Sequence, residues 1–125
     1  MKPIVTTLII ALIVSGCSLL PSKWDQNQAR VITDIRQEAG SFDCKADVGQ
    51  QLNALEKSIE WFQLYSNYRK ANDIGSMINK LDTTVKEFQD RASKGPISPT
   101  YCQLKKSIIT EEADIIGRTV GGSLQ

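Results

Sequence analysis

The residues of this 125-residue chain that could support catalysis are mainly carboxylates on predicted helices. Glu56 and Glu60 are four positions apart, and Glu111, Glu112 and Asp114 lie close together near the C-terminus. A facing pair of carboxyl groups could cleave a glycosidic bond. However, the sequence has no histidine, no G-x-S-x-G motif and no glycine-rich phosphate loop. We therefore interpret the carboxylates as solvated helix surface and expect no enzyme, no catalytic residue and no cofactor.

The N-terminal segment has the pattern of a signal peptide. Lys2 is positive, and residues 4–14 are apolar except for Thr6 and Thr7. A helix of this length spans about 16 Å, whereas crossing a bilayer core needs about twenty residues. The run is typical of the hydrophobic region of a signal peptide, and the small residues Ser15 and Gly16 suit a cleavage site. We expect residues 1–16 to be removed.

Cys17 follows this run directly, and Val14-Ser15-Gly16-Cys17 resembles the bacterial lipobox. The resemblance implies that the Cys17 thiol and the new amino terminus are both acylated. Two or more acyl chains anchor a protein stably, whereas one holds it only marginally. Because Ser18 and not aspartate comes next, the resemblance implies sorting to the outer membrane, with the domain facing the periplasm. The alternatives are an ordinary signal peptide with an incidental cysteine, or an uncleaved anchor.

Two further cysteines, Cys44 and Cys102, form an even pair, which indicates a disulfide in an exported protein. Zinc is the alternative, but it needs four ligands, and the chain has no histidine and three cysteines in all. We therefore predict a Cys44–Cys102 disulfide and no metal site. Closing a loop of roughly sixty residues would stabilise the fold by about 4 kcal/mol in the chain-entropy model.

The mature chain is expected to be neutral. Removing residues 1–16 takes away only Lys2 from the 15 basic residues, which then match the 14 acidic ones in number. A neutral protein in this compartment is not expected to bind nucleic acid, and no polybasic patch is present to help hold a membrane. Residues 17–125 are sufficient for one small domain with one core.

Hydrophobic periodicity predicts four helical segments and no strand. A thin stripe runs from Trp24 to Ala39, and Gly40 would end that helix. The next stripe is the strongest, and we expect its helix to begin after an Asp43 N-cap and to end between Tyr68 and Lys70. Its apolar positions are Cys44, Val48, Leu52, Leu55, Ile59 and Phe62.

The remaining two segments have clear boundaries. The third stripe runs from Ile74 to Phe88 and stops before the Gly95–Pro96 breaker. The fourth begins with Ser98 as N-cap and Pro99 at the first helical position, where a missing N–H has no cost. We expect a helical domain over residues 24–120, preceded by a lipidated tether over 17–23 and followed by a flexible tail over 121–125.

Helices joined by short loops pack antiparallel, so the second and fourth helices should begin at the same end of the molecule. Cys44 and Cys102 would then each lie in the first turn of a helix, close enough for a disulfide with α-carbons about 5.5 Å apart. We therefore predict an all-α fold. It is a small antiparallel bundle of three core helices, stapled by one disulfide, with the N-terminal helix as an arm or fourth member.

Trp61, Tyr65 and Tyr68 form a second stripe on the second helical segment, here called the aromatic stripe, and Arg69 follows it. By the 100° rule, the stripe is centred roughly 120° from the core stripe of the same helix. One interpretation is that the N-terminal helix packs here through Trp24, Val31 and Ile35. The other is a docking face for a protein partner, because tyrosine, tryptophan and arginine are enriched at interface hot spots.

Two short runs suggest an origin. The W-F-x-x-Y-x-x-Y-R run at 61–69 and the Y-C-x-x-K run at 101–105 are similar to sequences of small lipoproteins from large tailed phages. A small lipoprotein with a helical periplasmic domain also resembles the outer-membrane subunits of phage spanin complexes. That resemblance implies binding to an inner-membrane partner across the periplasm and disruption of the host outer membrane during lysis. The lipobox carries over at residues 14–17, but many such subunits are short and proline-rich, unlike this chain.

Other functions remain open at this point. An exclusion lipoprotein would block an outer-membrane receptor or entry step during superinfection or conjugation, and its partner would be an outer-membrane protein. An envelope-assembly accessory lipoprotein of a bacterium is a third hypothesis. An amphipathic bundle can also dimerise, so a homo-oligomer is compatible with each of them.

Overall fold

The computed structural model describes residues 24–122, which fold into α-helices joined by short turns. The helices are α2 (Gln26–Gly40), α3 (Val48–Tyr68), α4 (Asn72–Ser93) and α5 (Pro99–Gly122). The predicted signal peptide, the lipobox with Cys17, the tether and residues 123–125 lie outside the described residues. Within those residues α5 continues to Gly122, two positions beyond the expected end of the helical domain.

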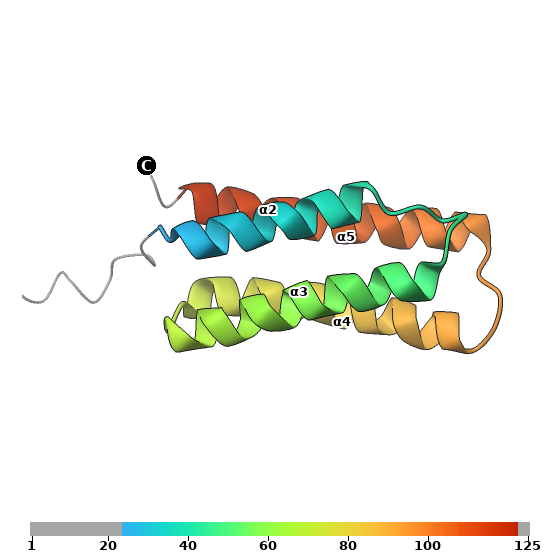
Figure 1. The fold of residues 1–125 in the computed structure, drawn as a ribbon, viewed down its shortest axis with the longest axis horizontal. Helices are drawn as coiled ribbons and strands as arrows, with labels where there is room; N and C mark the ends of the chain where they lie inside the picture. The colour runs from blue at the N-terminus through green and yellow to red at the C-terminus, as the bar shows by residue number, and fades with distance from the viewer. Residues whose placement is uncertain (1–23, 123–125) are drawn as a thin grey trace, which may run out of the picture.

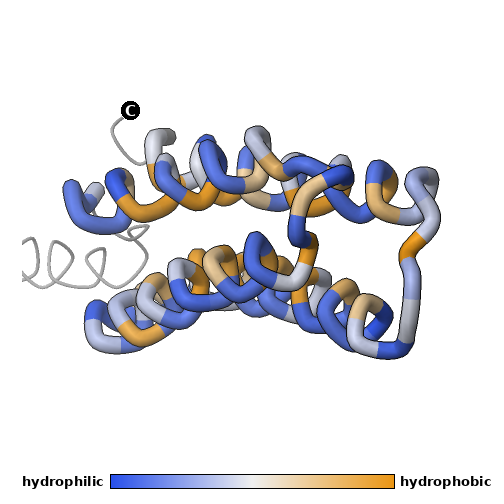
Figure 2. Tube along the Cα trace, turned by 45° about the vertical axis from the view of Figure 1, so that its right-hand side comes forward, coloured by the Kyte–Doolittle hydropathy of each residue, from blue (hydrophilic) through white to orange (hydrophobic). Residues whose placement is uncertain are grey.

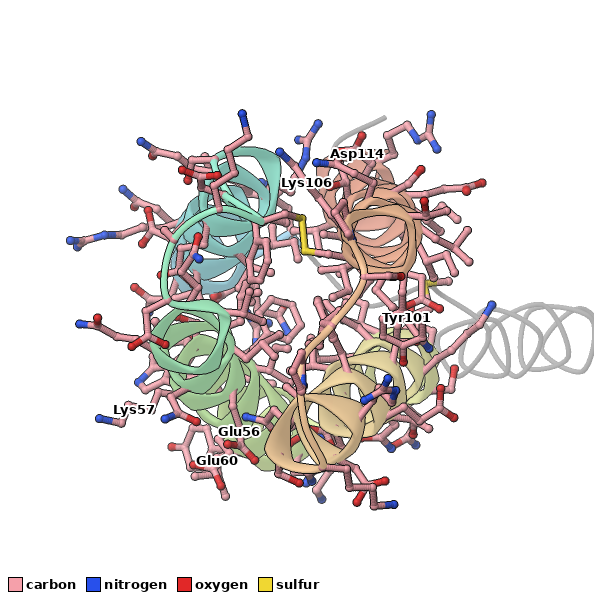
Figure 3. All side chains as sticks on the ribbon, turned by 90° about the vertical axis from the view of Figure 1, so that its right-hand side faces the viewer. Glu56, Lys57, Glu60, Tyr101, Lys106 and Asp114 are labelled. Carbon is pink, nitrogen blue, oxygen red and sulfur yellow. A yellow bond between two sulfur atoms is a disulfide. The ribbon has the colours of Figure 1, made fainter. Side chains whose placement is uncertain are left out.

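The four helices form an antiparallel bundle in which each helix packs against its two neighbours (Figure 1). α2 contacts α3 and α5, and α4 contacts the same two helices from the other side. Viewed end-on, the helices occupy the corners of a square, with α3 and α5 on one diagonal (Figure 3). The predicted all-α bundle is therefore confirmed, and the N-terminal helix is its fourth member.

The core fills the space between the helices. Hydrophobic segments of every helix turn toward the centre of the bundle, and hydrophilic ones face outward (Figure 2). On α3 and α4 the buried side chains match the predicted stripes, with Leu52, Leu55, Ile59 and Phe62 on α3 and Ile74, Ile78, Leu81, Val85 and Phe88 on α4. α2 adds Ile32, Ile35 and Ala39, and α5 adds Ile109, Ala113, Ile116 and Val120.

Side-chain caps define where α2, α3 and α5 begin, whereas α4 begins after Ala71 without one. The Asp25 carboxylate accepts a hydrogen bond from the Gln28 amide at 2.9 Å, and the Ser98 hydroxyl accepts one from the Tyr101 amide at 3.1 Å. The predicted Ser98 cap thus has the expected geometry. The predicted Asp43 cap of α3 is wrong, because Asp47 caps this helix by accepting from the Gln50 amide at 3.0 Å.

The predicted disulfide between Cys44 and Cys102 is present, with α-carbons 5.9 Å apart. Cys102 lies in the first turn of α5, as expected. Cys44 does not lie in a first helical turn, because it belongs to the turn that precedes α3. In that turn the Asp43 side chain accepts a hydrogen bond from the Lys45 amide at 2.8 Å, so Asp43 stabilises a turn rather than a helix.

The bundle has two distinct ends. The start of α2, the α3–α4 turn and the end of α5 lie together at the end where the chain enters, here called the tether end (Figure 1). The α2–α3 and α4–α5 connections lie at the other end, here called the disulfide end. Among residues 24–122, no helix has both the length and the apolar character needed to cross a membrane.

Candidate interaction surface

The aromatic stripe lies on the outer side of α3, toward the tether end. The rings of Trp61 and Tyr65 stack with centroids 4.9 Å apart and planes 13° from parallel. The Tyr65 and Tyr68 rings are 6.5 Å apart and tilted by 33°. Trp61 is 43 % exposed and Tyr68 is 85 % exposed, whereas Tyr65 between them is half-buried. The structure therefore brings the three predicted rings together into one continuous surface.

The start of α2 covers part of this stripe with polar groups. The Tyr65 hydroxyl donates to Asp25 Oδ2 at 3.1 Å and accepts from the Asn27 side-chain amide at 3.1 Å. Arg69 Nη1 forms an ion pair with the same Asp25 oxygen. Burial alone would raise the pKa of the Asp25 carboxyl, but hydrogen bonds from the Gln28 amide and Tyr65, together with the Arg69 charge, lower it overall. Asp25 thus ties the first turn of α2 to the end of α3.

The packing interpretation of the stripe describes part of this arrangement, and the docking interpretation stays a prediction. α2 does pack on α3, but its contacts with the stripe are the polar ones of Asp25 and Asn27. Ile35 is fully buried in the core, and Trp24 remains 40 % exposed. Arg69 is engaged with Asp25, whereas the faces of Trp61 and Tyr68 stay accessible.

A groove runs between α2 and α3, with Trp61 near its tether end, and it measures about 650 Å³. Its wall on α2 extends from Asn27 to the Ser41 cap, and its wall on α3 includes Lys57 and Ser58. The full lining is Asn27, Arg30, Val31, Asp34, Gln37, Glu38, Ser41, Lys57, Ser58 and Trp61. This α2–α3 groove is therefore elongated along the bundle axis and offers one large aromatic side chain among polar ones.

Two hydrogen bonds fix α2 against α3 beneath the groove. Gln28, whose side chain is buried, donates from Nε2 to the buried Ser66 hydroxyl at 3.2 Å. Nearer the disulfide end, the Ser58 hydroxyl donates to the Glu38 carboxylate at 3.2 Å. Burial raises the pKa of the Glu38 carboxyl; the Ser58 hydrogen bond opposes this shift, and the Asp34 charge adds to it.

The carboxylates considered for catalysis do not form one site. Glu56 and Glu60 lie on the outer side of α3, where the Glu56 carboxylate accepts from the Gln89 amide at 3.0 Å (Figure 3). On α5, Asp114 pairs with Arg36 of α2 at 2.7 Å, whereas Glu112 faces Lys80 of α4 at 3.8 Å. The C-terminal carboxylates therefore diverge toward different helices.

Glu112 departs from the expected solvated surface. Its side chain is buried, and its Oε2 atom has no hydrogen-bond partner among residues 24–122. The reason is its place on α5, which turns it into the contact with α4. In the part of the chain that the structure describes, no group of three or more histidine, cysteine, aspartate or glutamate side chains could hold a metal ion.

Sequence reasoning overlooked two residues of this surface. Leu64 is 72 % exposed beside Tyr68, and its signal was its spacing of three from Trp61 and four from Tyr68. Asp25 had no local signal beyond its cap position, because its partners Tyr65 and Arg69 are far away in the sequence.

No family model, curated protein or solved structure matches this chain.

Proposed function

We propose that this protein is a lipid-anchored outer-membrane lipoprotein that acts as a protein-interaction module. In this proposal it is the outer-membrane, spanin-like subunit that binds an inner-membrane partner across the periplasm and disrupts the outer membrane during host lysis. The lipobox resemblance at residues 14–17 supplies the anchor, and the bundle supplies the binding surface.

The observation that carries the interaction role is the exposure of Trp61. Trp61 is 43 % exposed beside the groove and belongs to one aromatic cluster with Tyr65 and Tyr68, and contiguous exposed apolar groups of this kind mark interaction sites. It is also pre-positioned, because Tyr65 stacks on it and is itself held by Asp25 and Asn27. A pre-organised aromatic side chain loses little conformational entropy on binding, and so makes an effective hot spot.

The shape of the α2–α3 groove favours a helical partner. A third helix can lie along the groove between two neighbouring helices and insert its side chains between theirs. The longest helix, α5, has 24 residues and is therefore about 36 Å long. A bundle of this length reaches only part of the way across the periplasm, so a bridging role requires an elongated partner segment.

The decisive experiment is deletion of the gene from the genome that carries it, followed by lysis in medium with stabilising magnesium. We expect deletion to leave unlysed spherical cells and the intact gene to restore lysis. A Trp61→Ala gene should fail to restore lysis, and a Leu104→Ala gene should succeed, because Leu104 is also exposed but lies on α5, diagonally opposite α3. Normal lysis after deletion would overturn the spanin-like role.

A second measurement on the Trp61→Ala protein distinguishes a lost partner contact from an unfolded domain. Trp61 rests on the surface, so Trp61→Ala should cost only about 1 kcal/mol of stability, the value of an exposed aromatic stack. Circular dichroism should therefore show an intact helical domain while chemical crosslinking in cells no longer recovers the partner. Recovery of a small inner-membrane protein with a periplasmic helix by the unaltered chain supports the proposal. Recovery of an outer-membrane receptor or porin would instead favour the exclusion lipoprotein.

A further inference from the structure

The tether end presents a second apolar surface, beyond the α2–α3 groove. Its exposed apolar side chains are Trp24, Leu64 and Tyr68, and together with the nearby cation Lys70 they are here called the tether-end patch. Leu64 is 72 % exposed and Tyr68 is 85 % exposed, the two largest values among the large hydrophobic residues of the described chain. Leu64 lies on the α4 side of α3, away from the groove that Trp61 lines.

The opposite end of the bundle is different. The turn over residues 41–47 and the connection over 94–98 expose only small, polar or charged side chains, while Phe42 is buried and Ile97 and Cys44 are half-buried. No large hydrophobic residue in these two connections is exposed. The two connections therefore lack the exposed large side chains of the tether end, although the disulfide end has an exposed Leu104 early in α5 and a pocket lined in part by Val48 and Ile97.

The tether determines what the patch can reach. Only residues 18–23 lie between Cys17 and Trp24. A chain of this length spans about 25 Å when fully extended. If Cys17 carries the lipid anchor, the tether end must therefore stay within about 25 Å of the bilayer surface, whereas the disulfide end can lie farther out.

The composition of the patch suits a bilayer interface. Tryptophan and tyrosine are enriched at the level of lipid headgroups, because each has an apolar ring and a polar atom that remains hydrated. Lys70 adds a positive charge at the α3–α4 turn, where it can approach anionic headgroups.

The backbone at Lys70 has an uncommon conformation for a residue other than glycine. Lys70 has a φ of 57°, in the left-handed region where a helix terminus ordinarily has glycine. A lysine is less stable than glycine in this conformation, so Lys70 carries a small conformational cost that a glycine at this position would not.

We propose that the tether-end patch seats the domain on the bilayer surface, with Trp24 and Tyr68 at headgroup level and Lys70 against anionic lipid. This inference rests on the lipid anchoring that the proposed function includes. The bundle then stands on the membrane with its disulfide end outward, and the α2–α3 groove runs away from the membrane toward the partner. The lipid surface is thus a second ligand of the domain, separate from the protein partner.

The chain contains two tryptophans, so intrinsic fluorescence can report the seating. The lipidated full-length protein with Trp61→Phe leaves Trp24 as the only reporter. It is reconstituted into vesicles of phosphatidylethanolamine with a minor share of phosphatidylglycerol, and the lipids carry bromine at shallow acyl positions. We expect the Trp24 emission to be quenched severalfold more strongly than that of Trp61, measured in a Trp24→Phe protein. Flotation of the protein with its vesicles tests the anchor independently.

The outcomes separate the two proposals. Flotation with strong quenching of Trp24 supports the seating. Flotation without quenching overturns the seating and leaves the lipid-anchored function standing, whereas failure to float overturns both. A photoreactive side chain at position 68 gives a second test in cells: an adduct with lipid supports the seating, and an adduct with a protein overturns it.

Variants of the patch provide the matched comparison. Lys70→Gly should raise the melting temperature, because glycine relieves the left-handed backbone, and it should also weaken association of the patch with anionic vesicles about fivefold. Leu64→Ser should reduce Trp24 quenching, and Leu104→Ser, at an exposed site on α5, should not. Equal effects of Leu64→Ser and Leu104→Ser, or unchanged seating in Lys70→Gly, would contradict the proposed contact.

Discussion

Asp25 joins more of this molecule together than any other single side chain of the interaction surface. One oxygen caps α2 through the Gln28 amide, and the other contacts both Tyr65 and Arg69 of α3. The same carboxylate therefore begins a helix, attaches it to its neighbour and orients the ring on which Trp61 stacks. Charged hydrogen bonds of this kind contribute more than neutral ones.

We expect Asp25→Asn to lower the stability at neutral pH by about 1–2 kcal/mol, since asparagine can still cap α2 but cannot pair with Arg69. The folded-state pKa of Asp25 is lowered from its ordinary value of 3.8. The stability that ionised Asp25 contributes to the fold is therefore present above pH 3.8, and it is lost as the pH falls through the lower folded-state pKa. Denaturant unfolding should show a difference between the two proteins that shrinks in this acid range. A constant difference down to pH 2 would contradict the assignment.

Glu38 provides the contrasting case on the same helix. Its pKa is raised from the ordinary value of 4.5, mainly by burial, so its ionisation opposes folding. Protonated Glu38 therefore contributes stability to the folded state that is fully present below pH 4.5. This contribution is lost as the pH rises through the raised folded-state pKa. Glu38→Gln should thus be neutral in acid and stabilising at pH 7, opposite in sign to Asp25→Asn. Destabilisation at pH 7 would show that the Ser58 hydrogen bond needs a carboxylate.

At the scale of the helix, sequence signals predicted a helix boundary correctly where one or two neighbouring residues determine it. Ser98 and Pro99 predicted the start of α5, and Gly95–Pro96 predicted the break before it. The start of α3 was misplaced, because Asp43 and Asp47 are both good caps and the apolar spacing of Cys44 continued the stripe. The disulfide and the turn held by Asp43 instead keep Cys44 outside the helix, which a periodic pattern cannot distinguish.

Two helical glycines allow a matched test of local stability. A β-carbon at Gly75 in α4 would meet nothing within 4 Å, so Gly75→Ala should stabilise the protein by about 0.5–1 kcal/mol. A β-carbon at Gly117 in α5 would lie 2.8 Å from the Arg36 side chain, which pairs with Asp114. Gly117→Ala should therefore stabilise the protein less than Gly75→Ala, because the Arg36 side chain must move to make room for the new methyl group. Thermal melts would contradict this account if Gly117→Ala were the more stabilising change.

At the scale of the whole molecule, two features could be predicted from the sequence. The antiparallel arrangement follows from the short loops, and the disulfide follows from the even pair of cysteines. The docking of α2 as a full member of the bundle could not be predicted, since its stripe is thin and includes the buried Gln28. That glutamine is accommodated by Ser66, a partner 38 positions away that no local pattern indicates. The same limit applies to the candidate surface, where packing of the N-terminal helix on the rings was one interpretation, but the polar contacts of Asp25 and Asn27 were not foreseen.

The disulfide should account for a large share of the total stability. Cys44 and Cys102 are separated by 58 positions, and the chain-entropy model assigns about 4 kcal/mol to a loop of this size. The Cys44→Ser/Cys102→Ser double variant should therefore melt about 15 °C lower or more, because each kcal/mol corresponds to roughly 4–8 °C in a domain of this size. Reduction of the unaltered protein should give a similar shift. Equal melting temperatures would show that the bridge contributes little.

The position of the disulfide also has a mechanical consequence. Both α3 and α4 lie entirely between Cys44 and Cys102 in the sequence, so the covalent bond encloses them in a closed loop. A pulling force applied at the tether and at the C-terminal end would follow a covalent path through α2, the disulfide and α5, and this path leaves out the backbone of α3 and α4. Tension can break the contacts that α2 and α5 make with these two helices, but it cannot extend their backbone. The segment that carries Trp61 and Tyr65 thus keeps a fixed chain length under load, which leaves it ready to repack when the force is released.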